Sequence, residues 1–324
     1  MKKVAIIVPY FGKLPDYFQL FLDSCRPNKR FDWIIFTNDK TEYDYPENVH
    51  RVDMTFKECR GIVQGRFDFD ITLHTPQKLC DYKCAYGYIF SDYLTEYDFW
   101  GYCDLDQIFG DLSAFVTDER LETYDKIYSL GHLTLYRNTE DNNRTFMSPL
   151  KGKEIYKEVF TTELGCAFDE WMEGNINEIY LESGRPAVYE NDGADVDPYK
   201  TALTVVDYDV EERRYVRSDI KNSIFVWECG KVFQMYLENG RLVKREYPYV
   251  HLQKRKMKDK RTKREGDKYY IVPNSFVDGE CDPVKLLKNA KKWRIINHQY
   301  FRVKWKSLKY RIKNKNWKFT SVFK

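Results

Sequence analysis

Four Asp-x-Asp pairs occur in this 324-residue sequence, and such a pair can hold a divalent cation through its carboxylate oxygens. Only one of them, Asp104 with Asp106, lies between two apolar runs, residues 97–103 and 108–112. Burying carboxylates costs free energy unless a cation offsets it, so we expect a metal site here; the alternative is that the two aspartates cap the following turn. The other three pairs are expected to be solvated or to lie in turns: Asp68/Asp70, Asp195/Asp197 and Asp207/Asp209.

Further polar residues follow predicted strands. Ligands of open α/β sheets bind beyond the carboxyl ends of the strands. The residues that close the first two strands are Pro9, Tyr10, Gly12, Thr37, Asn38 and Asp39. The sequence has no glycine-rich phosphate loop of the common types, so bound phosphates would need a cation held by carboxylates.

Alternating strands and helices must position these residues. Apolar, β-branched runs predict strands over residues 3–8, 33–36, 49–52, 99–103 and 127–130. Helical periodicity begins at Pro15 and again covers residues 76–94. This order indicates right-handed crossovers, so the predicted fold class is α/β, a mainly parallel Rossmann-like sheet flanked by helices.

The region from 131 to 250 is less regular. We expect a strand over 133–136, a helix over 151–160, a loop over 190–198 and a hairpin of 224–227 with 232–236. The composition changes near His251, since residues 254–264 include eight basic residues in eleven. We therefore predict two regions, an α/β domain over 1–253 and a basic, mostly helical C-terminal region over 254–324.

The segment 97–112 resembles the metal-binding segment of GT-A-fold glycosyltransferases. It is most similar to a little-characterised bacterial family from capsule and exopolysaccharide clusters, and more loosely to glycosyltransferase family 8. The resemblance spans roughly residues 3–256, with shorter matching segments at 8–12, 35–39, 78–83, 131–138, 168–170 and 251–255. It implies a GT-A fold and a hexosyltransferase that uses a nucleotide sugar.

The same resemblance implies a metal site and its ligands. In such enzymes the Asp-x-Asp holds Mn²⁺ or Mg²⁺ against the donor diphosphate. The implied ligands are Asp104, Asp106 and His251, with Asp106 the firmer one, and Lys254 is expected to contact phosphate oxygens. The alternatives are an ordinary histidine at a strand end and a solvated lysine.

The nucleotide is expected against the first two strand ends. Tyr10 can stack on the base, while Asn38 or Asp39 bonds its edge or the ribose; Pro9, Gly12 and Thr37 belong to the same surface. The predicted helix before the strand 99–103 contributes three further residues. Lys78, Asp81 and Lys83 are also predicted to bind the nucleotide sugar. Lys78 and Asp81 share a helix face, whereas Lys83 points elsewhere unless the helix ends early; the alternative for the pair is an exposed ion pair.

Asp169 and Glu170 form an acidic pair in an apolar setting. An inverting transferase needs a carboxylate that accepts the proton of the acceptor hydroxyl, and burial would raise its pKa toward that task. Either residue could serve, and the alternative is an acid pair at a helix start. A retaining enzyme would need no such base.

The composition limits the class of protein. With 43% hydrophobic and 17% aromatic residues the chain is globular, and no stretch is long enough to span a bilayer. The apolar start is broken too early for a signal peptide, and the eight scattered cysteines favour reduced thiols, so we expect a cytoplasmic protein. The net charge of +3 divides into −14 for residues 1–253 and +17 for residues 254–324.

The basic end carries an apolar stripe at helical spacing, formed by Phe301, Trp305, Leu308 and Ile312, with Trp293, Trp317 and Phe319 as further anchors. It predicts a helix lying on anionic lipid at the inner face of the membrane. The alternatives are nucleic-acid binding and docking on the acidic body of the protein.

Together these observations predict a peripheral, metal-dependent glycosyltransferase. Its donor is expected to be a UDP-sugar and its acceptor a surface or lipid-linked glycan, with no nucleic acid as partner. The alternatives are a nucleic-acid-binding protein that uses the basic tail, and a non-catalytic scaffold that binds sugar nucleotides.

Overall fold

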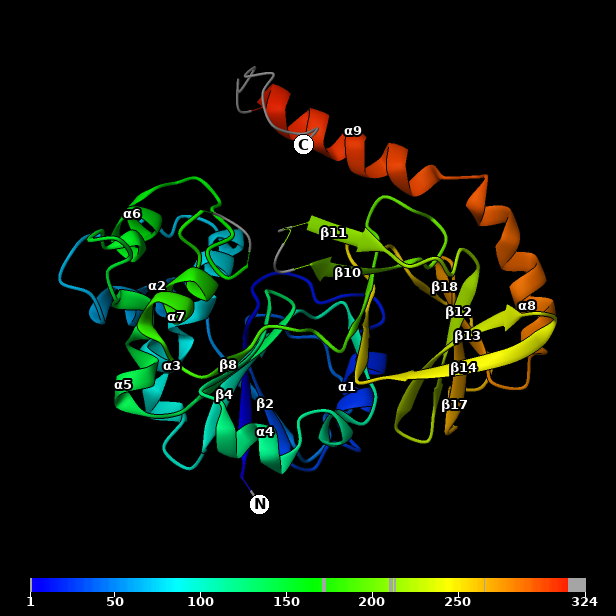
Figure 1. Cartoon of the computed structure of the whole chain (residues 1–324), viewed down its shortest axis with the longest axis horizontal. Coiled ribbons are helices and arrows are strands. Elements are labelled where there is room, and N and C mark those ends of the chain that lie inside the picture. Colours follow the sequence, from blue (N-terminus) through cyan, green and yellow to red (C-terminus); the bar gives the residue numbers. More distant parts are fainter. Residues whose placement is uncertain (1, 171–172, 210–211, 213, 265, 314–324) are drawn as a thin grey trace.

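The computed structural model describes residues 2–170, 173–209, 212, 214–264 and 266–313. A seven-stranded sheet of order β3-β2-β1-β4-β7-β6-β8 forms its centre (Figure 1). All pairings in this sheet are parallel except those of β7, which runs antiparallel to β4 and β6. The strands are β1 (Val4–Pro9), β2 (Phe31–Thr37), β3 (Val49–Asp53), β4 (Phe99–Cys103), β6 (Lys126–Leu130), β7 (Leu133–Arg137) and β8 (Ala187–Val188).

Helices cover both faces of this sheet. Side chains of β1 alternate between two cores because successive residues of a strand point to opposite faces. Ala5 and Ile7 pack with α2 (Phe56–Gly65), α3 (Tyr86–Ile89), α6 (Ile155–Thr161) and α7 (Ile176–Ser183). Val4, Ile6 and Val8 pack with α1 (Phe18–Cys25) and α4 (Asp118–Thr123). A short α5 (Glu140–Asn143) completes the helices at the left of Figure 1.

A second sheet, of order β11-β10-β9-β15-β5, adjoins the first. The chain passes from the first sheet to the second through residues 104–106, which connect β4 to β5. The carboxylates of the expected metal site therefore lie at the junction of two sheets. The strands are β5 (Gln107–Phe109), β9 (Ala194–Val196), β10 (Val205–Asp209), β11 (Arg214–Arg217) and β15 (Tyr249–His251).

A third sheet, of order β14-β13-β12-β17-β18-β16, lies at the right of Figure 1. Its strands are β12 (Ser223–Glu228), β13 (Lys231–Glu238), β14 (Arg241–Tyr247), β16 (Lys258–Asp259), β17 (Lys268–Val272) and β18 (Ser275–Asp278). Helix α8 (Pro283–Ala290) packs on it through Leu287 and Ala290, and α9 (His298–Lys313) ends the described chain. The 3₁₀ helices are η1 (Pro76–Ala85), η2 (Ser91–Tyr93), η3 (Leu112–Ala114), η4 (Thr145–Met147) and η5 (Lys291–Arg294).

The α/β class is confirmed, and a strand lies at each of the five early positions predicted. Several local predictions were wrong. Residues 76–94 form mainly 3₁₀ turns, the helix expected over 151–160 begins at Ile155, and the loop expected over 190–198 contains β9. Helix α2 was not expected, although Thr55 and Glu58 form a capping box at its start.

The boundary expected at 253/254 falls inside the third sheet. Strand β12 pairs with β17, with Phe225 opposite Ile271, so strands from both sides of residue 253 share one sheet. Helices begin only at Pro283 in this region. Among the described helices, none combines the length and apolar character needed to cross a membrane.

Candidate active site

A cleft of about 1340 Å³ opens where the first two sheets meet. This volume exceeds the roughly 300–1000 Å³ of ordinary small-molecule pockets, so the cleft has room for two substrates. Ten of the predicted site residues line it: Pro9, Tyr10, Asp81, Lys83, Asp104, Asp106, Asp169, Glu170, His251 and Lys254.

The three predicted metal ligands converge on the floor of the cleft. Nε2 of His251 lies 3.1 Å from Oδ1 of Asp106 and 3.7 Å from Oδ2 of Asp104. One ligand atom from each residue lies within 4.8 Å of the other two. Carboxylate oxygens are the donors that Mg²⁺ and Mn²⁺ prefer, and imidazole completes many such sites, so these residues fit the predicted cation.

Buried charges around this floor shift the pKa of several groups. Burial alone would raise the pKa of Asp106, but His251 and the backbone N–H of Lys254 hold it well below its usual range. Burial alone would lower the pKa of His251, yet Asp106 and Asp195 raise it well above its usual range. The carboxylate of Asp106 therefore stays ionised and faces the cleft.

Lys83 lies between the predicted metal ligand Asp104 and the acidic pair Asp169 and Glu170. Its ammonium donates to Oδ1 of Asp104 at 2.8 Å and to the carbonyl of Gly131 at 2.7 Å, and it lies 3.6 Å from Oδ2 of Asp169. The Lys83 side chain is only 9% exposed. One buried cation thus lies between the two groups of carboxylates that the sequence singled out.

Asp169 and Glu170 are brought to the same wall. Asp169 is buried, and burial raises its pKa to about 7, with Glu170 and Asp104 adding to the rise and Lys83 opposing it. Oε2 of Glu170 accepts a hydrogen bond of 3.0 Å from the N–H of Gly131. A carboxyl group that titrates near neutral pH can both accept and release a proton there.

Lys78 and Asp81 share a face, as predicted, and the alternative of an exposed ion pair is wrong. Their side chains are 5% and 3% exposed and lie 2.8 Å apart. Lys78 also donates to the carbonyls of Val159 and Leu164, and Asp81 accepts the N–H groups of Cys166 and Ala167. The pair therefore holds the segment that leads into Asp169, while Lys83 points away from it into the cleft.

The residues that close β2 do not line the cleft but bind the loop after β1. Asn38 accepts the N–H of Gly12 at 2.9 Å, and Asp39 accepts that of Leu14 at 2.7 Å. Gly12, Thr37, Asn38, Asp39 and Lys78 are the predicted residues that do not line the cleft. Asn38 and Asp39 hold the loop after β1, which carries Tyr10, and direct contact with a nucleotide stays a prediction for them.

The turn after β15 is strained. Gln253 and Lys254 both have left-handed backbone conformations, with φ of 41° and 52°, which cost non-glycine residues roughly 1–3 kcal/mol each. In this conformation the Lys254 N–H donates to Oδ2 of Asp106 at 2.9 Å, and the Gln253 amide donates to Asp195. The strained turn thus supports the residues of the metal site.

Sequence reasoning missed three polar residues of this site. The expectation that Asp195 and Asp197 are solvated or in a turn is wrong, since both are buried and Asp195 contacts His251. His132 lines the cleft with Nδ1 3.0 Å from the hydroxyl of Tyr249, and burial lowers its pKa to about 4. Gln253 completes the three. The available signals were the Asp-x-Asp spacing at Asp195 and the matching segments 131–138 and 251–255, which contain His132 and Gln253.

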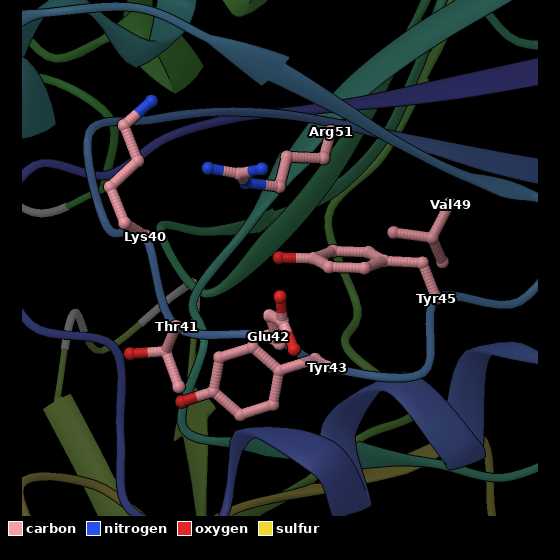
Figure 2. A pocket seen from close by; sticks show the side chains of 7 residues that line it. All are labelled: Lys40, Thr41, Glu42, Tyr43, Tyr45, Val49 and Arg51. Atoms are coloured by element: carbon pink, nitrogen blue, oxygen red, sulfur yellow. The ribbon is translucent and has the colours of Figure 1, made fainter.

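A smaller hollow of about 470 Å³ lies beside the loop after β2. Figure 2 shows Tyr43, Tyr45 and Arg51 gathered around it. None of the predicted site residues lines this hollow.

Comparison with known proteins gives a family and a distant structural likeness. Residues 6–280 match a family model described as "Family of unknown function (DUF6625)", and no curated protein matches the chain. Similar solved structures include the galactosyltransferase LgtC in complex with donor and acceptor sugar analogs, and an active-site mutant of LgtC. Each is 12% identical with a TM-score of 0.38, over 60% of this chain and 77% and 76% of theirs. So distant a likeness does not bear on the chemistry of this cleft.

Proposed function

This chain belongs to the family of unknown function DUF6625, and we propose that it is a metal-dependent glycosyltransferase of the GT-A type. It transfers a hexose from a nucleoside diphosphate sugar, a UDP-sugar in our proposal, to a surface-polysaccharide or lipid-linked glycan. One observation carries the proposal: Asp104, Asp106 and His251 converge in a cleft that also holds Asp169 and Glu170.

Different residues of the cleft have different roles in the proposed reaction. A Mn²⁺ or Mg²⁺ ion held by Asp104, Asp106 and His251 would stabilise the leaving nucleoside diphosphate. Lys254 lies beside this set and offers its ammonium to phosphate oxygens. The half-exposed ring of Tyr10 lines the cleft and offers an aromatic face to the base.

The acidic pair serves the acceptor in this proposal. The acceptor oxygen attacks the anomeric carbon, the bond from that carbon to the diphosphate breaks, and a carboxylate takes the hydroxyl proton. Asp169 is the better placed of the two, because it is buried near Lys83 and its pKa of about 7 suits a base at neutral pH. This role belongs to an inverting reaction.

The C-terminal helix supports a membrane-bound acceptor. Arg302 and Lys306 of α9 line the cleft, while Phe301 and Trp305 are 72% and 59% exposed. An apolar stripe that does not pack on the described body of the protein, beside many lysines, suits anionic lipid. We propose that α9 holds the enzyme on the cytoplasmic face of the membrane, with the cleft near lipid-linked acceptors.

The decisive experiment is a thermal-shift screen of nucleoside diphosphate sugars with and without Mn²⁺, followed by donor hydrolysis with the best ligand. A ligand that binds the native state raises the melting temperature according to its affinity. We expect a shift that needs Mn²⁺. The double substitution Asp104→Asn and Asp106→Asn should abolish this Mn²⁺-dependent shift. It should also lower turnover at least ~1000-fold, the scale of losing several kcal/mol of charge stabilisation.

The matched control is Asp68→Asn with Asp70→Asn, which changes an exposed Asp-x-Asp pair outside the cleft. This variant should behave like the wild type, and circular dichroism should show that both variants are folded. Metal-dependent turnover that survives in the Asp104/Asp106 variant would contradict the proposal. Tight nucleotide binding with no turnover on any acceptor would indicate a scaffold instead.

A further inference from the structure

Asp195 is a buried carboxylate next to the proposed metal site with no role in the function proposed above. Its side chain is 3% exposed and lies on β9, in a segment that we expected to be a loop. Oδ1 of Asp195 lies 2.8 Å from Nδ1 of His251. A carboxylate at this depth needs partners that offset its burial, and the imidazole is one of them.

The second sheet sets this contact through strand pairing. Strand β15 lies between β9, to which it is parallel, and β5, to which it is antiparallel. His251 is the register partner of Asp195 on one side and of Gln107 on the other, and Asp106 immediately precedes Gln107. The row across the three strands is therefore Asp195, His251 and Gln107, and Asp106, just before β5, brings a second carboxylate to the other ring nitrogen of His251.

The two ring nitrogens of His251 thus face different carboxylates. Nδ1 faces Asp195, and Nε2 faces Asp106 and Asp104. Histidines that ligate metals usually donate their other N–H to a carboxylate, which fixes the tautomer and the ring orientation. We propose that Asp195 is a positioning residue: it accepts the Nδ1–H of His251 and so holds the Nε2 lone pair toward the cation site.

Gln253 orients Asp195 in turn. Its Nε2 lies 2.7 Å and 2.8 Å from the two carboxylate oxygens of Asp195. The left-handed turn at Gln253 and Lys254 makes this contact and also directs the Lys254 N–H to Asp106. One turn therefore contacts both Asp195 and Asp106, the two carboxylates that face His251 from opposite sides.

This inference rests on the proposed function, since it assumes that a cation binds at Asp104, Asp106 and His251. The test measures cation binding directly, with Mn²⁺ alone as the probe and no sugar substrate. The dissociation constant of Mn²⁺ for the full chain is obtained by electron paramagnetic resonance of the free ion. Pulsed resonance then reports the coupling of the bound Mn²⁺ to the nitrogen of His251.

We expect Asp195→Asn to weaken Mn²⁺ binding about 10–100-fold, the usual effect of losing a partner of a metal-bound histidine. Gln253→Ala should weaken it about fivefold, the scale of one lost hydrogen-bonding contact. The nitrogen coupling should change in Asp195→Asn and disappear in His251→Ala. Adding Asp195→Asn to His251→Ala should cause no further loss, because the residue acts through the histidine.

The matched control is Asp197→Asn, which removes a buried carboxylate of the same segment that pairs with Arg217 instead of His251. Its Mn²⁺ affinity should stay within about twofold of the wild type, the range expected of a residue with no shared partner. Loss of Mn²⁺ affinity in both single variants, His132→Ala and Asp195→Asn, would indicate that Asp195 is a direct ligand of the cation. This result would overturn the positioning role.

The two proposals fail in different ways. Wild-type protein that binds no Mn²⁺ contradicts the metal-dependent function and removes the inference with it. Wild-type binding that falls in His251→Ala but not in Asp195→Asn overturns the inference alone, as do additive effects of the two changes. Should Asp195→Asn not fold, Gln253→Ala decides, since Gln253 is partly exposed and unchanged Mn²⁺ affinity in that variant contradicts the inference.

Discussion

At the scale of single residues, Lys83 has the most consequential surroundings. It is the buried cation shared by Asp104 of the metal set and Asp169 of the acidic pair. The sequence predicted a site residue here, but it predicted contact with the nucleotide and not with these two carboxylates. Helical spacing predicts the direction of a side chain on its own helix, but it does not predict which residues of other elements the side chain contacts.

Lys83→Met should destabilise the protein by about 3–5 kcal/mol, because it leaves the buried carboxylate of Asp169 and the partly exposed one of Asp104 without their counter-charge. Urea unfolding followed by circular dichroism measures this free energy of unfolding. Lys231→Met is the matched control, since it breaks an exposed ion pair with Glu246 worth at most about 1 kcal/mol. Equal costs for the two changes would contradict the interpretation of Lys83.

Lys126 is a second buried lysine, and it lacks a carboxylate partner in the part of the chain that the structure describes. Its ammonium donates to the carbonyl of Tyr128 and to Oδ1 of Asn177, and it lies 5.5 Å from the ring centre of Tyr189. Burial lowers its pKa to about 7. The folded protein therefore releases this proton near pH 7, whereas the unfolded chain keeps it to about pH 10.4.

Between these two values the unfolded state binds more protons, so stability rises with pH. The wild type should gain about 2–3 kcal/mol relative to Lys126→Met between pH 6 and pH 9. Urea unfolding of both proteins at several pH values measures the difference. Lys285→Met, at an exposed position of α8, should differ from the wild type by the same amount at every pH. A pH-independent difference for Lys126→Met would show that this lysine stays charged when folded.

At the scale of elements, the loop after β6 fixes the positions of Asp169 and Glu170 through Gly131. Gly131 donates its N–H to Glu170 and its carbonyl accepts from Lys83. A Cβ at this position would overlap Oδ2 of Asp169 and lie 3.3 Å from Oε2 of Glu170. Only glycine lets both carboxylates approach this backbone, so the loop and the wall depend on each other.

Gly131→Ala should therefore displace Asp169 and lower the turnover number about 100-fold, the effect of a displacement near 1 Å. Mn²⁺ affinity, measured separately, should change little because the metal ligands are not displaced. Unchanged turnover would argue against Asp169 as the base.

Gly61→Ala tests the same substitution where space is free. Gly61 is exposed on α2, and a Cβ there would meet nothing within 4 Å. We expect a gain of about 0.5–1 kcal/mol in the free energy of unfolding, with unchanged turnover, because alanine suits a helix interior better than glycine. Thermal and urea unfolding measure it, and a loss of stability would contradict the exposed position.

Apart from α2, elements with a strong local pattern were predicted, whereas β9, which depends on distant partners, was not. β1, β2 and β4 are buried on both faces and read as continuous apolar runs. β9 has three residues, two of them Ala194 and Asp195, and it is a strand only because β10 and β15 pair with it. No local pattern distinguishes such a segment from a loop.

At the scale of the whole molecule, the basic C-terminal region is divided between two structures. Residues 254–278 contribute strands to the third sheet, whereas α9 presents Phe301, Trp305, Leu308 and Ile312 to solvent. The start of this helix is held by Thr201, which donates to Asn297 just before the helix and accepts the N–H of Gln299 in its first turn. The apolar stripe is thus not covered by the described body. Trp317 and Phe319 lie outside the described residues.

The full chain should sediment with vesicles that contain anionic lipid and not with neutral vesicles, and high salt should weaken this binding. Phe301→Ser with Trp305→Ser should lower the partition coefficient at least ~10-fold, since two large apolar side chains no longer enter the interface. Leu181→Ser, at an exposed apolar position of α7, is the control and should have no effect. Salt-sensitive binding to RNA without binding to vesicles would favour the nucleic-acid alternative.

The sequence by itself determined the α/β class, most strands of the central sheet and the contrast between an acidic body and a basic end, while the family resemblance added the predicted ligands Asp104, Asp106 and His251. These properties are carried by composition and by patterns a few residues long. The tertiary structure alone decided that Asp195 supports His251 and that Lys83 joins the two acidic groups. His251 lies 56 residues from Asp195 and 145 from Asp106 along the chain. Contacts over such separations exist only once strands β9, β15 and β5 have paired, because their register places Asp195 opposite His251 and brings the residue before β5, Asp106, beside it.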